Sequence, residues 1–313
     1  MNLAELEPRM PGPSWEGWFF IAIGRRGNAV RFAKWHLFRA GPGRGHPIAA
    51  FEGLRGPAEL CTFVGSADRV IHHCEAIAPE AIEARRGALA VVVPGRLRLH
   101  ADGDRVRLRF DDPAAGLAAD LGCRPRDRLE WARWGGLLNY VGFPGGLDGR
   151  LTALGGDHVL SGIAMAEHAW GGNLPIDPQR LRVPWTWDVL AFDGDGDGEP
   201  PVAAALAVAL PGTRRAVRMR GTLPGGAPAR FDRHRVDYTA IDGDTPRQWR
   251  GRMSGPAGEL DYQATAATPA AGAFPDGAFL GFDFTGRWRG PAGERLVSGA
   301  GFAEHRLPAN RSR

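Results

Sequence analysis

Glu16, Glu167 and Asp188 are carboxylic acids that each lie within three residues of a tryptophan. A carboxyl group that is buried among aromatic side chains is desolvated, so its pKa rises and it stays protonated near neutral pH. Such a group can protonate an alkene or open a ring, and aromatic faces stabilise the resulting positive charge. These three residues are therefore the candidate catalytic acids. The candidate substrate-binding residues beside them are Trp18, Trp170, Trp185, Trp187 and His168.

Side chains of a β-strand alternate between its two faces, and this decides which candidates can act together. Glu16 and Trp18 are two residues apart and point to the same face. Trp185 and Trp187 also share a face, whereas Asp188 takes the opposite one. The sequence therefore favours Glu16 with Trp18 as a pair that shares one cavity.

Part of the chain is repeated. Residues 149–168 (GRLTALGGDHVLSGIAMAEH) and 286–305 (GRWRGPAGERLVSGAGFAEH) align without a gap, with eight identical residues. The shared run S-G-x-x-x-A-E-H ends in Glu167 and His168 in the first copy and in Glu304 and His305 in the second. A duplication of this kind predicts two similar domains, each of which closes with the same strand.

The repeat also offers an alternative role for Glu167. A residue that the architecture needs twice is readily explained as structural, for instance as a carboxylate that pairs with Arg150 in one copy and with Arg287 in the other. For His168 and His305, hydrogen bonds that close a barrel are the alternative to ligand binding. Adjacent side chains diverge on a strand, so Glu167 and His168 cannot face the same lumen.

Length and composition agree with two all-β domains. A chain of 313 residues is long for one core. Its 45 glycines and 25 prolines predict many turns between short strands. The clearest strands flank the Asp-Gly turn within residues 96–110. We expect a loose lead-in at residues 1–14, one barrel at 15–172, a second at 173–313, and a single short helix at 129–140.

Composition and missing motifs exclude several classes of protein. The net charge of +4 comes from scattered arginines without a nucleic-acid-binding motif, so we expect no nucleic-acid partner. No run approaches 18 apolar residues and no signal peptide is evident, which predicts a cytoplasmic protein without stable membrane insertion. The chain lacks G-x-S-x-G, P-loop, H-E-x-x-H and dinucleotide-binding motifs, which weakens hydrolase, kinase, metalloprotease and dehydrogenase readings.

The sequence gives little support for a disulfide or a metal. The chain has three cysteines: Cys61, Cys74 and Cys123. Their odd number and the lack of a C-x-x-C pair predict neither a disulfide framework nor a zinc site. In the run HHCE, strand alternation leaves only His72 with Cys74, and two ligands do not make a zinc site. The loop that begins at Asp193 starts like a calcium loop but has Ala204 at its twelfth position. We therefore expect no metal and no cofactor.

Three segments together resemble tocopherol-cyclase-like proteins and their AttH and carotenoid-hydratase relatives. They are residues 15–19 (WEGWF), residues 166–171 (AEHAWG) with 184–187 (PWTW), and residues 301–305 (GFAEH). The resemblance implies two lipocalin-like antiparallel barrels in tandem, with an apolar site at or between their mouths. It also implies a cyclase, isomerase or hydratase that acts on terpenoid, polyene or polyketide-like chains without an organic cofactor. One departure is His168, where the group often has lysine.

Two functions of different classes follow. The first is an enzyme whose acid, Glu16 or Glu167, protonates a large hydrophobic small molecule in an aromatic-lined cavity. The second is a carrier, a double lipocalin that binds a lipid or pigment without chemistry, because barrels bind apolar ligands with or without catalysis. A scaffold with filled barrels is the third possibility. A carboxyl group that faces a cavity away from water and arginine favours the enzyme, whereas carboxylates held in salt bridges favour the carrier.

Overall fold

The computed structural model describes residues 2–9, 15–41, 57–130, 139–172, 185–194, 201–210, 213–217, 219–222, 228–243, 245–274 and 277–307. These residues form β-strands and two short 3₁₀ helices, η1 (Leu3–Leu6) and η2 (Pro79–Ala81), which confirms the all-β prediction. The ends of the expected helix lie instead in strands β10 (Leu129–Glu130) and β11 (Asn139–Ala153), and its middle lies outside the described residues. Neither described helix has the length or apolar character to cross a membrane.

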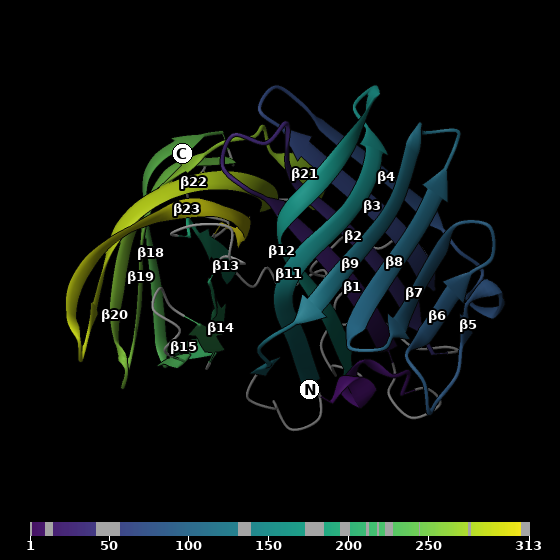
Figure 1. Cartoon of the computed structure of the whole chain (residues 1–313), viewed down its shortest axis with the longest axis horizontal. Coiled ribbons are helices and arrows are strands. Elements are labelled where there is room, and N and C mark those ends of the chain that lie inside the picture. Colours follow the sequence, from purple (N-terminus) through teal and green to yellow (C-terminus); the bar gives the residue numbers. More distant parts are fainter. Residues whose placement is uncertain are drawn as a thin grey trace.

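The first sheet is antiparallel and curls into a barrel (Figure 1). Its strand order is β4-β3-β2-β1-β12-β11-β9-β8-β7-β6-β5, and β10 pairs with β11. Besides β10 and β11, its strands are β1 (Trp15–Gly24), β2 (Val30–Ala40), β3 (Ala58–Ser66), β4 (Val70–Ala76), β5 (Glu83–Ala84), β6 (Ala90–Val93), β7 (Leu97–Asp102), β8 (Arg105–Asp112), β9 (Leu117–Pro125) and β12 (Gly156–Gly171).

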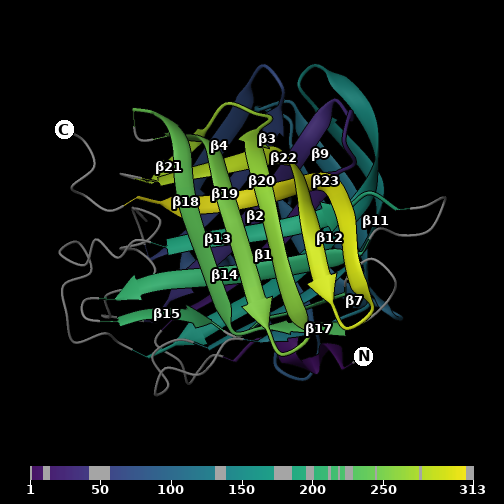
Figure 2. The ribbon, with the colours of Figure 1, turned by 90° about the vertical axis from the view of Figure 1, so that its left-hand side faces the viewer.

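The second sheet has the order β17-β16-β14-β13-β23-β22-β20-β19-β18, with β15 beside β14 and β21 beside β22. Its strands are β13 (Trp185–Phe192), β14 (Val202–Leu210), β15 (Thr213–Val217), β16 (Met219–Thr222), β17 (Pro228–Phe231), β18 (Arg233–Asp242), β19 (Thr245–Gly255), β20 (Gly258–Ala266), β21 (Ala271–Phe274), β22 (Gly277–Gly290) and β23 (Gly293–Arg306). The sheet curls so that β18 contacts β14 and β15, and Figure 2 shows β18 to β20 crossing β13 and β14. This architecture is consistent with two lipocalin-like barrels in tandem.

The repeated segment forms equivalent hairpins in the two sheets, β11–β12 and β22–β23. The glycine of its shared Ser-Gly pair, Gly162 in one copy and Gly299 in the other, is required because the neighbouring strand passes too close for a side chain. A Cβ atom at Gly162 would lie 2.2 Å from the backbone oxygen of Ile23, and one at Gly299 would lie 2.0 Å from that of Ala191. The repeated Ser-Gly pair is therefore explained by the close approach of β12 to β1 and of β23 to β13.

Both faces of β1 are buried, which explains why its sequence is apolar apart from Glu16. Phe20 belongs to the core inside the first barrel, whereas Phe19 belongs to a second core that continues into the other barrel. Aromatic rings meet across the interface between the barrels; Phe63 on β3 lies 4.8 Å from Phe279 on β22, measured between ring centroids. The two barrels are thus joined by an apolar interface.

The N-terminal segment is not a loose lead-in, so that expectation is wrong for its described part. Leu6 is fully buried against the first barrel. The indole nitrogen of Trp18 donates a hydrogen bond to the carbonyl oxygen of Leu6 at 3.0 Å, and Nδ1 of His168 lies 2.9 Å from the carbonyl oxygen of Glu5. The segment owes its position to these barrel contacts, which its short sequence does not reveal.

Gly251 on β19 leaves room for the ring of Tyr262 on β20. A Cβ atom at Gly251 would lie 1.9 Å from Cζ of Tyr262. We therefore expect Gly251→Ala to lower the free energy of unfolding by about 1–3 kcal/mol through overpacking, as measured by urea denaturation. Gly156→Ala is the matched control, because a Cβ atom there meets nothing closer than 3.8 Å. An equal loss in both variants would contradict the explanation.

Candidate functional site

The candidate site residues fall into three buried groups. The group inside the first barrel contains Glu16, Trp18, His168 and Trp170. The group inside the second barrel contains Asp188. Glu167 and Trp187 belong to the third group, which lies between the barrels. Trp185 opens β13, and its side chain lies outside the described residues.

In the first barrel, Glu16 is enclosed by positively charged and hydrogen-bonding groups. Its Oε1 lies 3.1 Å from Nε2 of His168, and its Oε2 accepts a hydrogen bond from Nη2 of Arg39 at 2.9 Å. The backbone N–H of Arg9 also donates to Oε1. Trp18 stacks on the imidazole of His168 with parallel planes and ring centroids 5.2 Å apart. Glu16 and Trp18 thus lie on one face, as alternation predicts.

These contacts make Glu16 a poor proton donor. Burial raises its pKa, but the hydrogen bonds and charge of His168 and the hydrogen bonds from Arg9 and Arg39 outweigh burial, so the pKa lies below its ordinary value. A carboxylate that is ionised and paired with arginine at neutral pH has no proton to transfer.

In the second barrel, Asp188 is fully buried and accepts from three side chains. Tyr262 donates to Oδ2 at 2.6 Å, Nε2 of His305 lies 3.0 Å from Oδ1, and Nε2 of His234 lies 3.2 Å from Oδ2. Burial raises the pKa of Asp188, but the charges and hydrogen bonds of His305 and His234 hold it well below its ordinary value. Asp188 is therefore also an ionised, paired carboxylate.

The repeated histidines have corresponding roles in the two barrels. His168 on β12 reaches the carboxylate of Glu16 on the neighbouring strand β1, and His305 on β23 reaches that of Asp188 on the neighbouring strand β13. Glu16 lies two residues before Trp18, which is directly opposite His168. Asp188 lies two residues after Thr186, which is directly opposite His305. These hydrogen bonds fit the structural alternative raised by the repeat.

Glu167 has a different environment, at the interface between the barrels. Its side chain points away from the first barrel lumen, on the opposite face from His168. The hydroxyl of Tyr140 on β11 donates to its Oε1 at 2.6 Å. Phe19 lies directly opposite Glu167 on β1, and the ring of Trp187 packs edge-on against Tyr140 with centroids 5.6 Å apart. A tyrosine hydroxyl, rather than an arginine, is therefore the described hydrogen-bond donor to this carboxyl.

A buried lysine completes this interface group. Nζ of Lys34 lies 3.0 Å from Oε2 of Glu304 and 3.8 Å from the centroid of the Phe279 ring. The ammonium is only 1% exposed and is stabilised by both the carboxylate and the aromatic face.

Arg287 pairs with Glu294 at 2.8 Å, so the expected pairing of Arg287 with Glu304 is wrong.

Burial sets the protonation state of Glu167. It raises the pKa of the carboxyl to about 8; the hydrogen bond from Tyr140 and the charge of Lys34 act to lower it, and the charge of Glu304 raises it further. Burial and the neighbouring Glu167 likewise raise the pKa of Tyr140 well above its ordinary value. Of the three candidate acids, Glu167 is the one whose carboxyl is protonated at neutral pH.

Sequence reasoning missed Lys34 and the tyrosines, although composition contains a signal for each. Lys34 is the single lysine of a chain that otherwise uses arginine. The chain has only three tyrosines, and all contact the proposed groups: Tyr140 binds Glu167, Tyr262 binds Asp188, and Tyr238 packs edge-on against His305. Rare polar residues in an arginine-rich and tryptophan-rich chain were therefore informative.

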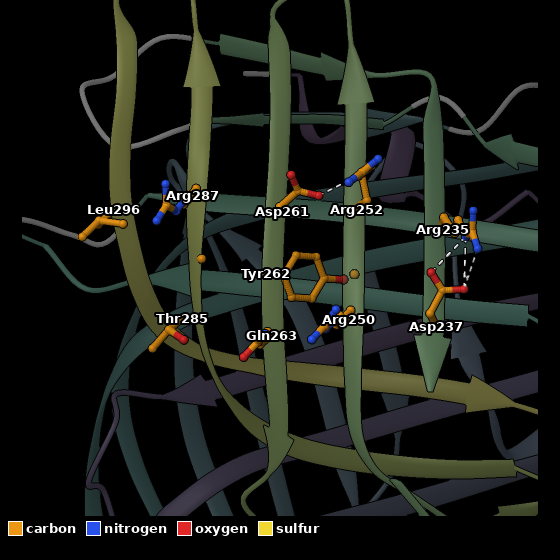
Figure 3. A pocket seen from close by; sticks show the side chains of 12 residues that line it. Arg235, Asp237, Arg250, Arg252, Asp261, Tyr262, Gln263, Thr285, Arg287 and Leu296 are labelled. Atoms are coloured by element: carbon orange, nitrogen blue, oxygen red, sulfur yellow. Dashed lines mark hydrogen bonds and ion pairs between the residues drawn. The ribbon is translucent and has the colours of Figure 1, made fainter. Parts of the chain in front are cut away.

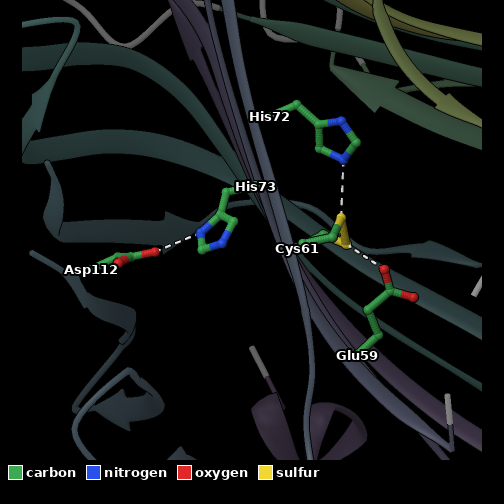
Figure 4. The surroundings of a disulfide bond; sticks show 6 residues. Glu59, Cys61, His72, His73 and Asp112 are labelled. Atoms are coloured by element: carbon green, nitrogen blue, oxygen red, sulfur yellow. Dashed lines mark hydrogen bonds and ion pairs between the residues drawn. A yellow bond between two sulfur atoms is a disulfide. The ribbon is translucent and has the colours of Figure 1, made fainter. Parts of the chain in front are cut away.

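The expectation of no disulfide is also wrong, because Cys61 and Cys74 are bonded (Figure 4). The two residues lie directly opposite each other on β3 and β4, with Cα atoms 4.1 Å apart. Cys123 is buried and takes no part in this disulfide.

Two hollows lined by described residues lie away from Glu167. One of about 620 Å³ lies on the outer face of the second barrel (Figure 3). Its lining includes the ion pairs Arg252–Asp261, at 2.6 Å, and Arg235–Asp237, at 3.0 Å. The other, of about 180 Å³, lies between the Gly24–Arg26 turn and the end of β13. The charged lining of the first suits polar ligands rather than the apolar substrate that the sequence predicts.

Comparison with known proteins finds solved structures with a similar fold. No protein-family model and no curated protein sequence matches the chain. The structure of an AttH-like protein from Nitrosomonas europaea matches with a TM-score of 0.62 and 14% identity, over 96% of this chain and 97% of that one. Kievitone hydratase from Nectria haematococca matches with a TM-score of 0.58 and 13% identity, over 98% and 92%. CghA matches with a TM-score of 0.61 and 13% identity, over 96% and 93%.

These matches extend over almost the whole of both chains, so they include both barrels and their order. Identity of 13–14% makes them evidence of fold alone. The resemblance drawn from the three sequence segments is confirmed at that level: this chain has the tandem lipocalin-like fold of the AttH-like protein, kievitone hydratase and CghA.

Proposed function

We propose that this protein is a cofactor-independent acid catalyst for a large hydrophobic substrate, with Glu167 as the proton donor. The observation that carries the proposal is the raised pKa of about 8 at a buried carboxyl that is hydrogen-bonded by Tyr140. A general acid works best when its pKa lies near the operating pH, and Glu167 meets that condition. Glu16 and Asp188 then serve as structural, ionised partners of the repeated histidines.

The chemistry follows from the arrangement around Glu167. The hydrogen bond from Tyr140 engages Oε1, so the transferable proton resides on Oε2. The proton passes to an alkene carbon, or to a ring oxygen whose C–O bond then breaks with the electron pair going to the oxygen; either route leaves a carbocation and a carboxylate. The faces of Phe19 and Trp187 would stabilise the cation, and Tyr140 and the charge of Lys34 would stabilise the carboxylate. Loss of a proton from the cation back to Glu167 gives a cyclised or isomerised product. Capture of the cation by water, with loss of a proton from that water to Glu167, gives a hydrated one.

The substrate class that we propose is a terpenoid, polyene or polyketide-like small molecule. Its support is the apolar, aromatic surroundings of Glu167 together with the fold shared with a kievitone hydratase. The hydrophobic small molecule is the expected partner, and the reaction is expected to require no nucleic acid and no organic cofactor.

A carrier is the second candidate, because one observation favours it. The carboxylates inside both barrels, Glu16 and Asp188, are paired with charged or hydrogen-bonding side chains, as expected of barrels that bind a ligand without chemistry. The two candidates differ in whether the bound compound changes.

The test compares the small molecules that copurify with the wild type, Glu167→Gln and Glu16→Gln, by native mass spectrometry and lipid extraction. Glutamine at position 167 can still accept from Tyr140 but has no proton to transfer, so turnover should fall by about 10²–10⁴-fold. We expect Glu167→Gln to accumulate an unreacted apolar compound that the other two proteins lack. The same compound, unchanged, in all three proteins would establish the carrier. Accumulation in Glu16→Gln alone would assign the acid to Glu16.

A further inference from the structure

Metal-ligating side chains form a row across three adjacent strands of the first barrel. His36 on β2 lies directly opposite Cys61 on β3, and Cys61 lies directly opposite Cys74 on β4. Directly opposite residues project from the same face of a sheet, so all three side chains meet above β3. The ligand atoms of these residues lie within 4.8 Å of one another.

His72 adds a fourth ligand from the same face. It precedes Cys74 by two residues, and its Nε2 lies 3.0 Å from Sγ of Cys74. Figure 4 shows His72 directed at the sulfur atoms, whereas His73 points to the other side of β4, toward Asp112. We propose that, once the Cys61–Cys74 bond is reduced, His36, His72, Cys61 and Cys74 bind one zinc ion.

The present separations bracket those of tetrahedral coordination. Zinc binds sulfur at about 2.3 Å and imidazole nitrogen at about 2.0–2.1 Å, which places tetrahedral ligand atoms roughly 3.3–3.8 Å apart. The present separations lie on both sides of this range, at 3.0 Å for His72 to Cys74 and up to 4.8 Å within the row. After reduction, the two sulfur atoms would move apart and the two imidazoles would shift to bring all four ligand atoms to these distances.

The surroundings hold the ligands in place and leave a route for the ion. His36 and Cys61 are each 2% exposed, and the ring of Phe63 stacks on that of His72 with centroids 4.4 Å apart. Along the strand order, β4 is the end of the first sheet, and His72 on it is exposed to solvent. The sheet therefore fixes the buried ligands His36 and Cys61, and a metal ion can reach the site from solvent at β4.

The chemistry balances without a further group. A phosphine or thiol reductant supplies two electrons to the disulfide, and the two thiols release two protons when zinc binds. Two thiolates and two neutral imidazoles around Zn²⁺ give a neutral centre, which limits the cost of burying the ion at this position, where Oε1 of Glu59 lies 3.1 Å from Sγ of Cys61. Oxidation by a small-molecule disulfide reverses the process: two thiolates lose two electrons, the Cys61–Cys74 bond forms again, and zinc is released. Four protein ligands leave no open position, so the ion is structural and ties β4 to β2.

The test uses the full chain, reduced with a phosphine and desalted without oxygen, then titrated with Co²⁺. We expect one equivalent to produce the visible bands of tetrahedral cobalt and a sulfur-to-metal charge-transfer band, and Zn²⁺ to abolish both. The oxidised protein should show neither band. A reduced protein that gives no such spectrum, or that binds cobalt only in octahedral form, overturns the proposal.

Two variants test the ligands on β4, and a third serves as the control. Cys74→Ser and His72→Gln should each weaken cobalt binding at least about tenfold and change the spectrum. His73→Gln is the matched control, because it is the neighbouring residue on the opposite face and should bind as the wild type does. Circular dichroism under the same reducing conditions checks that each variant is folded. Folded Cys74→Ser or His72→Gln protein with an unchanged cobalt spectrum overturns the assignment, as does equal loss in His73→Gln.

Discussion

Asp188→Asn is expected to lower the free energy of unfolding by about 3–5 kcal/mol at neutral pH, the usual loss when one partner of a buried charged network is removed. Asp188 is fully buried and accepts from Tyr262, His305 and His234. Asparagine would turn an N–H₂ group toward at least one of these donors. Urea denaturation measures the loss. Asp120→Asn is the control, because its ion pair with Arg107 is half-exposed and should contribute less than about 1 kcal/mol.

The effect of Asp188 should also depend on pH with a defined sign. Its pKa in the folded protein lies well below the ordinary 3.8, so the ionised carboxylate contributes stability that is present above pH 3.8 and lost as the pH falls. The difference between wild type and Asp188→Asn should stay constant near neutrality and shrink by about 1.4 kcal/mol for each pH unit below about 4. A difference that does not change between pH 6 and pH 2 would show that Asp188 is not an ionised partner.

Local alternation made part of this site predictable from the sequence. The two-residue period of a strand places Glu16 with Trp18 and separates Trp187 from Asp188, and it sends Glu167 and His168 to opposite faces. The structure has these arrangements. The repeat predicted the equivalent hairpins for a similar reason, since alignment without a gap preserves the alternation in both copies.

Contacts that depend on strand register or on packing between barrels were not predictable in this way. Lys34 reaches Glu304, and Trp187 reaches Tyr140, only because one face of the first sheet packs against the second barrel. Those partners are more than forty residues apart in sequence, and alternation does not say which strands become neighbours.

The disulfide lies between these two cases. Cys61 and Cys74 are equally distant from the turn at residues 67–68, so a symmetric hairpin would place them opposite each other. The odd number of cysteines and the absence of C-x-x-C argue against a disulfide framework, whereas this spacing favours a single disulfide. His36 lies opposite Cys61 because of the register between β2 and β3. The spacing within the β3–β4 hairpin does not predict that register.

Glu167→Gln is expected to become more stable than the wild type as the pH rises. The folded pKa of about 8 exceeds the ordinary 4.5, so the stability of the wild type is highest below pH 4.5. It falls as the pH rises from 4.5 to 8, because the carboxyl ionises in the unfolded chain but not in the folded protein. Glutamine does not titrate. The stability of Glu167→Gln relative to wild type should increase between pH 4.5 and 8 by at most roughly 5 kcal/mol, and then level off. Urea denaturation at five pH values between 5 and 9 measures it.

Glu16→Gln is the comparison for that series, because the pKa of Glu16 is lowered rather than raised. The stability difference between Glu16→Gln and wild type should be flat between pH 5 and 9 and should change only in acid. A Glu167→Gln series that is equally flat would mean that Glu167 is already ionised at pH 5, and the proposed proton donor would be lost with it.

Lys34→Met tests the titration of Glu167 by removing a neighbouring positive charge. The charge of Lys34 lowers the pKa of Glu167, so its removal should move the alkaline inflection of the stability difference, and of any catalytic rate, to higher pH. Lys34→Arg keeps the charge and should leave the inflection near that of the wild type if the guanidinium fits beside Phe279 and Glu304. Loss of stability alone, without a shift, would show that Lys34 only joins the barrels. An upward shift in Lys34→Met would show that the single lysine of the chain keeps the pKa of Glu167 close to neutral pH, where a general acid is most useful.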